Sequence, residues 1–348
     1  MNNTAQHSET LEAMARALSL AARSPEVGRN PRVGCVLVDD SGAIVAEGYH
    51  RGAGHPHAEV EALRDAEKRG VDTQGLTAVV TMEPCNHHGS TGPCSLALQQ
   101  AGIARVVYGA SDPGELSGGG HHTLDQAGID VLGGVSAEQA EELNRHWFFA
   151  MRHQRPFVTA KWAQSLDGRG AATDHTSQWI TGEDSRERVH QQRARHGVIM
   201  VGTTTALIDN PSLTARTPGG GLAEHQPQAV VVGHRDIPED AALRDHPGGF
   251  QQIHSHAPKG VLGELFEQGF RSVYLEGGKT LMSAFIHADL VDEYHITMGP
   301  LLLGGPQLAV DDIGVNTMSD AKALTISSVE TLGRDVWVVA TPARAKEE

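Results

Sequence analysis

The sequence predicts an α/β protein with two domains, each built around its own sheet. Strand and helix patterns alternate along the first half, they start again after Pro156, and 348 residues are enough for two domains of ordinary size. The junction between Trp147 and Pro156 is basic and aromatic. We therefore expect one domain over residues 1–150 and a second over residues 151–348.

The first domain is expected to begin with a helix over 9–23, because apolar residues recur there at helical spacing until Ser24-Pro25 ends the pattern. Apolar, β-rich runs separated by turn residues predict the strands, and periodic segments predict the helices. The expected strands cover 33–38, 43–48, 77–82 and 105–108, and the further helices cover 57–69, 95–101 and 139–147. This order favours an α/β sandwich around a mixed sheet.

The same signals predict another α/β sheet in the second domain. Its expected strands cover 157–162, 197–202, 228–233 and 272–275, and its expected helices cover 186–195 and 280–287. Gly277-Gly278 stands between the last strand and the last helix, where a glycine pair lets a phosphate approach backbone amides. A tight turn without a ligand is the alternative reading of that pair.

One short stretch carries the chemistry of the first domain. His57-Ala58-Glu59 precedes Pro84-Cys85, and Cys94 follows after eight intervening residues. One imidazole and two thiolates leave the fourth tetrahedral position of a zinc ion open, as in a catalytic site, and zinc lowers the pKa of a bound water to roughly 7. Glu59 is too far round to ligate the same ion and would carry protons to the leaving ammonia. Two buried free cysteines beside an unrelated His-x-Glu are the alternative.

Composition and charge argue against several other classes of protein. A net charge of −15 argues against a protein that wraps nucleic acid. Three cysteines do not make a disulfide framework, and Cys35 lies in an apolar run as a small core residue. Because the polar N-terminus shows no secretory signal and no apolar stretch is long enough to span a bilayer, we expect a cytoplasmic protein without a membrane partner.

Many motifs together make the chain resemble the bifunctional deaminase/reductase family of riboflavin biosynthesis along nearly its whole length. The first domain contributes Asn30 to Cys35, Gly48-Tyr49-His50, Ala53 to Glu59 and Met82 to Cys85 with Gly92-Pro93-Cys94. The second contributes Arg155 to Val158, Ser165 to Gly168, Ser177 to Gly182, Gly202 to Thr205, Asp209 to Arg216 and Leu275 to Gly278. Eight residues between the cysteines separate this family from nucleoside and tRNA deaminases, which resemble the shorter C-x-x-C form.

The resemblance implies a cytidine-deaminase-like α/β/α domain followed by a dihydrofolate-reductase-like α/β domain. It implies zinc and NADPH as cofactors and a pyrimidine ribosyl phosphate as the small-molecule substrate. That substrate, a diamino-ribosylamino-pyrimidinone 5′-phosphate, would lose its 2-amino group by hydrolysis and then have its ribosyl group reduced to ribityl. We also expect a homo-oligomer. A protein in which only the reductase half works on this intermediate, and a regulator that binds zinc and nucleotide without turnover, are the alternatives.

The resemblance also assigns site residues. In the first domain His57, Cys85 and Cys94 would hold the metal, Glu59 would be catalytic, and Asn30, Val33 and His50 would contact the deaminase substrate. The expected contacts of the reductase substrate are Lys161, Ser177, Arg193, Leu213, Arg216 and Glu276. The expected contacts of NADPH are Gln164, Trp179, Gly202, Thr205, Asp209, Gly278, Lys279 and Thr280. The cations among them suit a phosphomonoester, which needs charge-assisted donors.

Two departures from the family pattern fall in the first domain. Ser90 stands where the family usually has Lys or Arg, and Asp112-Pro113-Gly114-Glu115 stands where it usually has a Pro-Asn-Pro-like segment. The lost cation could have met the substrate phosphate, so a slower deaminase, an altered substrate, or replacement by His87 or His88 is expected.

Overall fold

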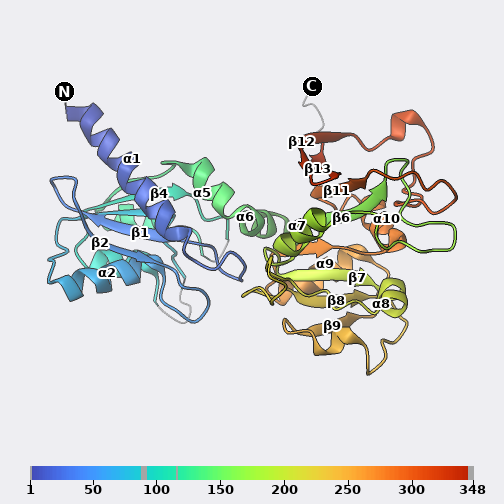
Figure 1. The fold of residues 1–348 in the computed structure, drawn as a ribbon. Helices are drawn as coiled ribbons and strands as arrows, with labels where there is room; N and C mark the ends of the chain where they lie inside the picture. Colours follow the sequence, from blue (N-terminus) through green and yellow to red (C-terminus); the bar gives the residue numbers. More distant parts are fainter. Residues whose placement is uncertain (1, 88–91, 115–116, 344–348) are drawn as a thin grey trace. The chain divides into compact units, whose positions relative to one another are not determined.

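The computed structural model describes residues 2–87, 92–114 and 117–343 (Figure 1). The chain divides into two compact units, residues 1–153 and 154–348. Ser90, His88 and Glu115, on which part of the expectations rests, lie outside the described residues. Within the described part of the chain, no helix has the length and hydropathy that crossing a bilayer requires.

The first unit has a five-stranded mixed sheet in the order β2-β1-β3-β4-β5. The strands are β1 (Gly34–Val38), β2 (Ile44–Tyr49), β3 (Thr77–Met82), β4 (Arg105–Ala110) and β5 (Asp130–Leu132). β1 is antiparallel to both β2 and β3, whereas β3, β4 and β5 run parallel. The mixed sheet expected from the sequence is confirmed.

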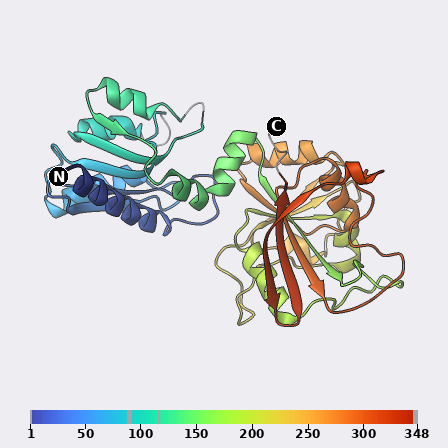
Figure 2. The ribbon, with the colours of Figure 1, turned by 90° about the horizontal axis from the view of Figure 1, so that it is seen from above.

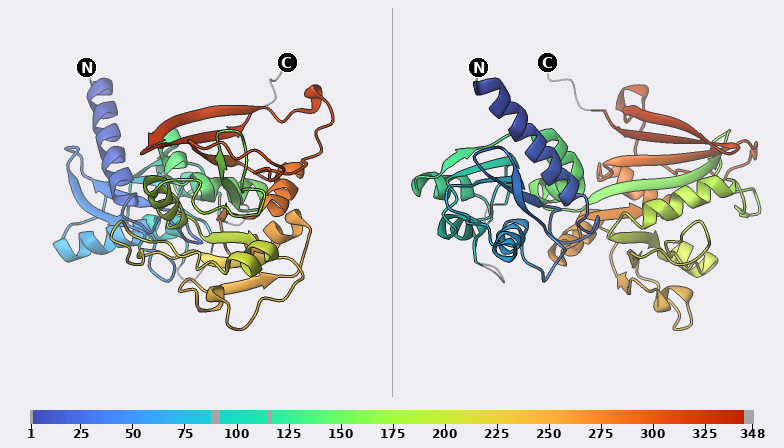
Figure 3. Two further views of the ribbon diagram at one scale, coloured as in Figure 1. Left: turned by 45° about the vertical axis from the view of Figure 1, so that its right-hand side comes forward. Right: turned by 60° about the vertical axis from the view of Figure 1, so that its left-hand side comes forward.

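Helices cover both faces of this sheet, which makes the unit an α/β/α sandwich (Figure 3). Alternate residues of β1 point to opposite faces. Val36 and Val38 pack with α1 (Asn2–Ala21). Cys35 and Leu37 pack on the other side, with α2 (Ala58–Arg69), α3 (Cys94–Gln100) and α4 (Gly120–Gln126). Cys35 is therefore the buried core residue that its apolar surroundings predict.

Glycine at one position of β2 brings α2 close to the sheet. A Cβ added to Gly48 would lie 2.3 Å from the Ala62 nitrogen and 2.5 Å from the Ala58 oxygen. No other residue has room there, because the helix backbone itself occupies the space. The close approach fixes the N-terminal end of α2, which carries His57 and Glu59.

The single helix expected over 139–147 is wrong, because two helices occupy this region. α5 (Ala137–Leu143) and α6 (Arg145–His153) are separated at Asn144. The Asn144 side chain accepts a 2.7 Å hydrogen bond from the Arg32 amide and donates one of 2.9 Å to the Arg32 carbonyl. This pairing with a segment 112 residues away lies at the break between the two helices, and α6 continues to His153.

The second unit has an eight-stranded sheet in the order β12-β13-β11-β6-β10-β7-β8-β9. Its strands are β6 (Phe157–Ser165), β7 (Val198–Gly202), β8 (Gln228–Val232), β9 (Phe250–Ile253), β10 (Ser272–Leu275), β11 (Glu293–Gly299), β12 (Leu324–Leu332) and β13 (Asp335–Pro342). β13 is antiparallel to β11 and β12, and the remaining pairs are parallel. Figure 2 shows the long β12–β13 hairpin in dark red in the foreground of this unit.

Helices cover both faces of the second sheet as well. α9 (Pro258–Glu267) and α10 (Lys279–His287) pack on the face that carries Val158, Met200 and Val230. The other face meets α8 (Thr203–Asp209) and α7 (Glu183–Arg193), the latter through Val189. Two short 3-10 helices complete the unit, Ala242–Asp245 and Met318–Asp320. The second α/β domain is thus confirmed, while α8, α9, β9, β11, β12 and β13 were not expected.

A buried histidine of the second unit gives a prediction about stability and pH. His196 Nδ1 lies 2.7 Å from the Gln192 carbonyl and Nε2 lies 3.1 Å from the Thr159 hydroxyl, so a neutral ring can satisfy both nitrogens. Burial lowers the pKa of His196 to about 4. In the unfolded chain His196 has a pKa of ~6.5 and binds a proton below that pH, whereas in the folded chain it stays neutral. The free energy of unfolding should therefore fall by about 3 kcal/mol from pH ~6.5 to ~4.

Urea unfolding of wild type and His196→Gln at a series of pH values between these limits checks this expectation. The variant lacks the titrating ring, so its stability should depend less on pH. Parallel curves for the two proteins would contradict a neutral buried His196.

Candidate active site

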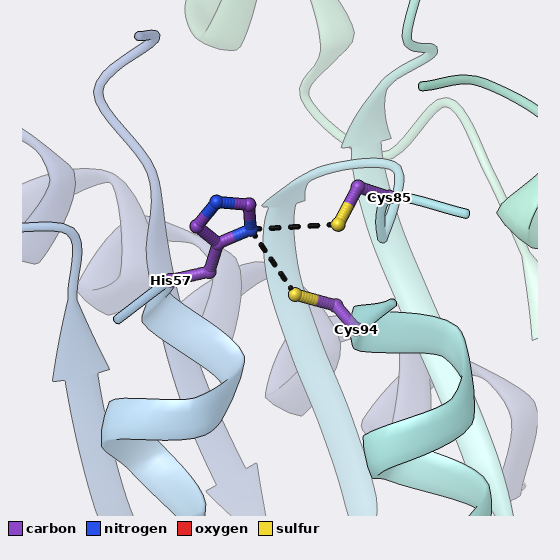
Figure 4. A group of neighbouring side chains, drawn as sticks. All are labelled: His57, Cys85 and Cys94. Atoms are coloured by element: carbon purple, nitrogen blue, oxygen red, sulfur yellow. Dashed lines mark hydrogen bonds between the residues drawn. The ribbon is translucent and has the colours of Figure 1, made fainter. Parts of the chain in front are cut away.

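The zinc-ligand candidates meet at the N-terminal ends of two helices of the first unit (Figure 4). His57 is the residue before α2, Cys94 is the first residue of α3, and Cys85 follows β3. A 3.2 Å hydrogen bond from the Ser95 amide to the Cys85 carbonyl ties the two cysteine segments together. The helix ends favour negative charge on the thiolates.

The distances fit a tetrahedral zinc ion. His57 Nδ1 lies 3.3 Å from Cys94 Sγ and 3.4 Å from Cys85 Sγ, and the three ligand atoms all lie within 4.8 Å of one another. A tetrahedron with Zn–N near ~2.0 Å and Zn–S near ~2.3 Å has N···S edges of about 3.5 Å. Imidazole and thiolate are also the donors that zinc prefers. The site therefore fits zinc with three protein ligands and one open position.

The electrostatics of the three ligands agree with metal binding. Hydrogen bonds from Cys94 and His57 lower the pKa of Cys85 to about 4 although burial opposes this, whereas the hydrogen bond with Cys85 and burial raise the pKa of Cys94. Zinc ligates the thiolate form of cysteine, so the lowered pKa of Cys85 suits a metal ligand.

Glu59 lies in the first turn of α2, buried beside this cluster. Burial, followed by the charge of Cys85, raises the pKa of Glu59 to about 7. A carboxyl group with that pKa can both accept and donate a proton near neutral pH. The geometry thus pairs a metal-ligand cluster with a proton-transfer group that is not part of it.

The three expected contacts of the deaminase substrate lie together next to His57. The Asn30 side-chain nitrogen is 3.1 Å from His50 Nε2, and the His50 amide donates to the Val33 carbonyl at 2.9 Å. The rings of His50 and His57 pack edge to face with centroids 5.4 Å apart. His50 Nδ1 lies 2.9 Å from the Pro56 carbonyl, which leaves Nε2 as an acceptor for Asn30.

Glu83 is a site residue that sequence reasoning missed. Its carboxylate accepts hydrogen bonds from the backbone amides of Asp112, Gly119 and His121 at 3.2, 3.2 and 3.0 Å. It therefore fastens Asp112 and the N-terminal end of α4 (Gly120–Gln126) to the strand end that carries Cys85. The available signal was an acidic residue directly before Pro84-Cys85.

In the second unit, the structure joins three of the expected substrate contacts. Arg193 holds Glu276 with two bonds of 2.7 and 2.9 Å and also donates to the carbonyl of Thr214, next to Leu213. Both side chains are largely buried, 14% and 10% exposed. Burial opposes ionisation of Glu276, but the charge and hydrogen bonds of Arg193 lower its pKa below the ordinary value. Burial lowers the pKa of Lys161, whose ammonium lies in the field of this pair.

The other expected contacts are more dispersed. Leu213 is buried with a positive φ of 51°, Ser177 is exposed, and Arg216 is exposed and bonds the Gly220 carbonyl at 2.9 Å. No hydrogen bond among the described residues joins Ser177 or Arg216 to the Arg193–Glu276 pair. Arg193, which was expected to contact a phosphate, pairs instead with the carboxylate of Glu276.

Two expected NADPH contacts come together where β10 meets α10. The Gly278 amide donates to the Thr205 hydroxyl at 3.0 Å, which joins the N-terminal end of α10 to α8. Gly202 is the residue before α8, and Asp209, whose pKa burial raises, ends it. Thr280 lies in α10, and Lys279 in its first turn pairs with Asp311 at 3.0 Å.

The remaining two expected NADPH contacts lie on other segments. The exposed ring of Trp179 stacks under the Arg186 guanidinium, 4.5 Å from its centroid. The side-chain oxygen of Gln164, on β6, accepts a 2.8 Å hydrogen bond from the Trp162 indole.

Comparison with known proteins gives a consistent result for both units. Residues 7–110 match the family described as the cytidine and deoxycytidylate deaminase zinc-binding region, and residues 156–338 match the RibD C-terminal domain. The riboflavin biosynthesis protein RibD of Mycobacterium tuberculosis strain H37Rv is 46% identical over 307 residues, which is 88% of this chain and 89% of that protein. RibD of Escherichia coli K12 is 38% identical over 360 residues, 93% and 96% of the two chains.

Solved structures agree. RibD of Acinetobacter baumannii, form 1, has a TM-score of 0.86 at 34% identity and covers 97% of this chain and 100% of its own. A diaminohydroxyphosphoribosylaminopyrimidine deaminase/5-amino-6-(5-phosphoribosylamino)uracil reductase from Thermotoga maritima has a TM-score of 0.78 at 31% identity, with the same coverage. With a zinc-binding deaminase region in its first unit and a RibD C-terminal domain in its second, the chain belongs to the RibD family of bifunctional riboflavin-biosynthesis enzymes.

Proposed function

We propose that the chain carries out two consecutive steps of riboflavin biosynthesis on one pyrimidine ribosyl phosphate. The first unit, taken as residues 1–150, hydrolyses the 2-amino group of 2,5-diamino-6-ribosylamino-4(3H)-pyrimidinone 5′-phosphate. The second, taken as residues 151–348, reduces the ribosylamino group to ribitylamino with NADPH. The observation that carries the first step is the cluster of His57, Cys85 and Cys94 with buried Glu59 beside it.

In the deamination, His57, Cys85 and Cys94 hold zinc, which when bound activates water for attack at neutral pH. Glu59 takes a proton from the attacking water and gives a proton to the departing amino group. Its pKa of about 7 supports both transfers. Asn30, Val33 and His50 contact the pyrimidine beside His57, an assignment supported by their mutual hydrogen bonds.

In the reduction, the substrate meets Lys161, Ser177, Arg193, Leu213, Arg216 and Glu276, and NADPH meets Gln164, Trp179, Gly202, Thr205, Asp209, Gly278, Lys279 and Thr280. The bond between Gly278 and Thr205 supports one cofactor surface across α8 and α10. The Arg193–Glu276 pair supports a role for Glu276 as a fixed acceptor for ribosyl hydroxyls, since its carboxylate is held by two bonds.

A test of both steps uses the purified protein with the diamino pyrimidinone phosphate, with and without NADPH. Ammonia release and NADPH oxidation are followed separately. Ammonia without NADPH, and NADPH oxidation once deaminated substrate is present, are expected. NADPH oxidation without any ammonia would favour the reductase-only alternative. A regulator without turnover would show neither, and a buried proton-transfer group at Glu59 has no use in such a protein.

Removing zinc should separate the two activities. Chelation is expected to abolish ammonia release and to leave NADPH oxidation with pre-deaminated substrate unchanged, because the three ligand candidates all belong to the first unit. The measurement is both rates before chelation, after it, and after zinc is restored. Loss of NADPH oxidation on chelation would contradict chemically separate units.

We also propose that the enzyme works as a homo-oligomer in the cytoplasm. Support for a reducing compartment comes from its three cysteines, none of which is in a disulfide. Support for an oligomer comes from the edge strand β12, on which Ile326 and Val329 are 63% and 61% exposed. An exposed apolar edge strand favours association. Ile326→Lys should therefore lower the mass measured by light scattering, whereas an unchanged mass would contradict an interface at β12.

A further inference from the structure

A row of polar side chains lies on the face of the second sheet that α7 covers through Val189. Glu293, His295 and Thr297 alternate along β11, so they share a face. The register of β11 and β6 puts His295 beside Lys161. On the other flank of β6, Glu276 follows Leu275, which pairs with Ala160. Lys161 therefore stands between Glu276 and His295.

Glu293 and His295 form a buried carboxylate–imidazole pair. His295 Nε2 lies 2.9 Å from a Glu293 oxygen, and the two residues are 4% and 8% exposed. Nδ1 of His295 is buried without a hydrogen-bond partner among the described residues, and so is the hydroxyl of Tyr274. The two rings have centroids 5.9 Å apart. Buried polar atoms nearly always have a hydrogen-bond partner. His295 Nδ1 and the Tyr274 hydroxyl can therefore each bond an ordered water or join one hydrogen-bond network.

Tyr274 connects this pair to the substrate side of the sheet. Burial, followed by the charge of Glu276, keeps the pKa of Tyr274 well above its ordinary value, and Arg193 and Glu293 also act on it. The hydroxyl consequently remains protonated and can donate and accept at once. Tyr274 lies on β10 two residues before Glu276, and its ring centroid is 5.9 Å from that of His295.

The proposed reduction needs a proton as well as a hydride. Hydride passes from NADPH to C1′ of the ribosyl group, the C1′–O4′ bond breaks with its electron pair on O4′, and O4′ takes up one proton as NADPH becomes NADP⁺. Lys161 is the cation proposed at the substrate, and no hydrogen bond to its ammonium is formed by the described residues. We assign Lys161 as the donor of the proton that O4′ takes up, and such a donor must recover its proton after each turnover.

Resting on the reductase function proposed above, we infer that His295, oriented by Glu293, is a positioning residue that passes protons to Lys161 from the buried side of the sheet. Its imidazole can take a proton at one nitrogen and release one at the other, which no amide can do. The charged and titratable groups recorded next to it are Glu293 on its own strand, Lys161 opposite it on β6, Tyr274 of β10 and His196 before β7.

The test compares His295→Gln with wild type in NADPH oxidation on the deaminated substrate. Glutamine can keep the hydrogen bond to Glu293 but cannot titrate. We expect kcat to fall at least about tenfold, less than the roughly 10²–10⁴-fold expected for a direct acid or base. The solvent deuterium isotope effect on kcat should rise, because proton delivery becomes slower than hydride transfer. KM for NADPH and ammonia release should not change.

Thr297→Val is the matched control, because it removes another buried polar group from the same face of β11. It should keep the wild-type kcat and isotope effect. Glu293→Gln, which weakens the orientation of His295, should shift both in the direction of His295→Gln and covers the case in which that variant does not fold. A folded His295→Gln with wild-type kcat and isotope effect, or equal losses in Thr297→Val, would overturn the inference. Absence of NADPH oxidation in wild type would overturn the proposed reductase function instead.

Discussion

Replacing Glu59 by glutamine is expected to lower ammonia release by about 10²–10⁴-fold, the usual range for a general acid–base group. The amide keeps the size of the side chain but cannot accept or release a proton. Glu59 is not among the three clustered ligand atoms, so the zinc content should remain at the wild-type level. Ammonia assays and metal analysis of the purified variant measure the two quantities.

Glu61→Gln is the matched control, because Glu61 also lies in the first turn of α2 but pairs with Arg51 and Arg64 near the surface. It should release ammonia at the wild-type rate. Both variants should oxidise NADPH normally with deaminated substrate. If Glu59→Gln loses its zinc, Glu59 holds the metal and does not act as the proton-transfer group.

Arg193→Met is expected to destabilise the second unit by about 3–5 kcal/mol, because it leaves the Glu276 carboxylate buried without its partner. The pair is 14% and 10% exposed, and two hydrogen bonds of 2.7 and 2.9 Å hold it. The reductase activity should be lost as well, since Glu276 would no longer be fixed. Urea unfolding of the purified variant measures the change in free energy.

Arg188→Met provides the control from the same helix. Arg188 pairs with Glu330 at 3.0 Å, but the two side chains are 28% and 43% exposed. A solvent-exposed pair is worth about 0–1 kcal/mol, so this variant should be nearly as stable as wild type. In the double variant Arg193→Met/Glu276→Leu, much of the lost stability should return, because no unpaired charge remains. Equal stability of Arg193→Met and Arg188→Met would contradict the buried-pair argument.

The candidate zinc ligands could be predicted because they lie close together in the sequence. His57, Glu59, Cys85 and Cys94 lie within one short stretch, and the strand and helices that carry them have clear signals. β3 was expected over 77–82, where it lies, because its apolar run is buried on both faces of the sheet. A strand that is buried on both faces appears in the sequence as a continuous apolar run.

Elements without such a local sequence pattern could not be predicted. β12 is exposed along most of its length and therefore lacks a run of buried apolar residues, although it pairs with β13 at eight positions. The break between α5 and α6 depends on a hydrogen-bonded pairing of Asn144 with Arg32, far away in the chain. No local pattern contains that contact.

The sequence by itself predicted the two-domain α/β order, the candidate metal ligands and Glu59 as the candidate proton carrier, because these depend on residue type and short-range spacing. The tertiary structure alone decided the pairing of Arg193 with Glu276, the hydrogen bonds of Glu83 to Gly119 and His121, and the position of Glu293 and His295 beside Lys161. Each of these joins segments that are distant in sequence. Their electrostatic effect depends on burial and on separations of a few ångström, which arise only when the sheets assemble.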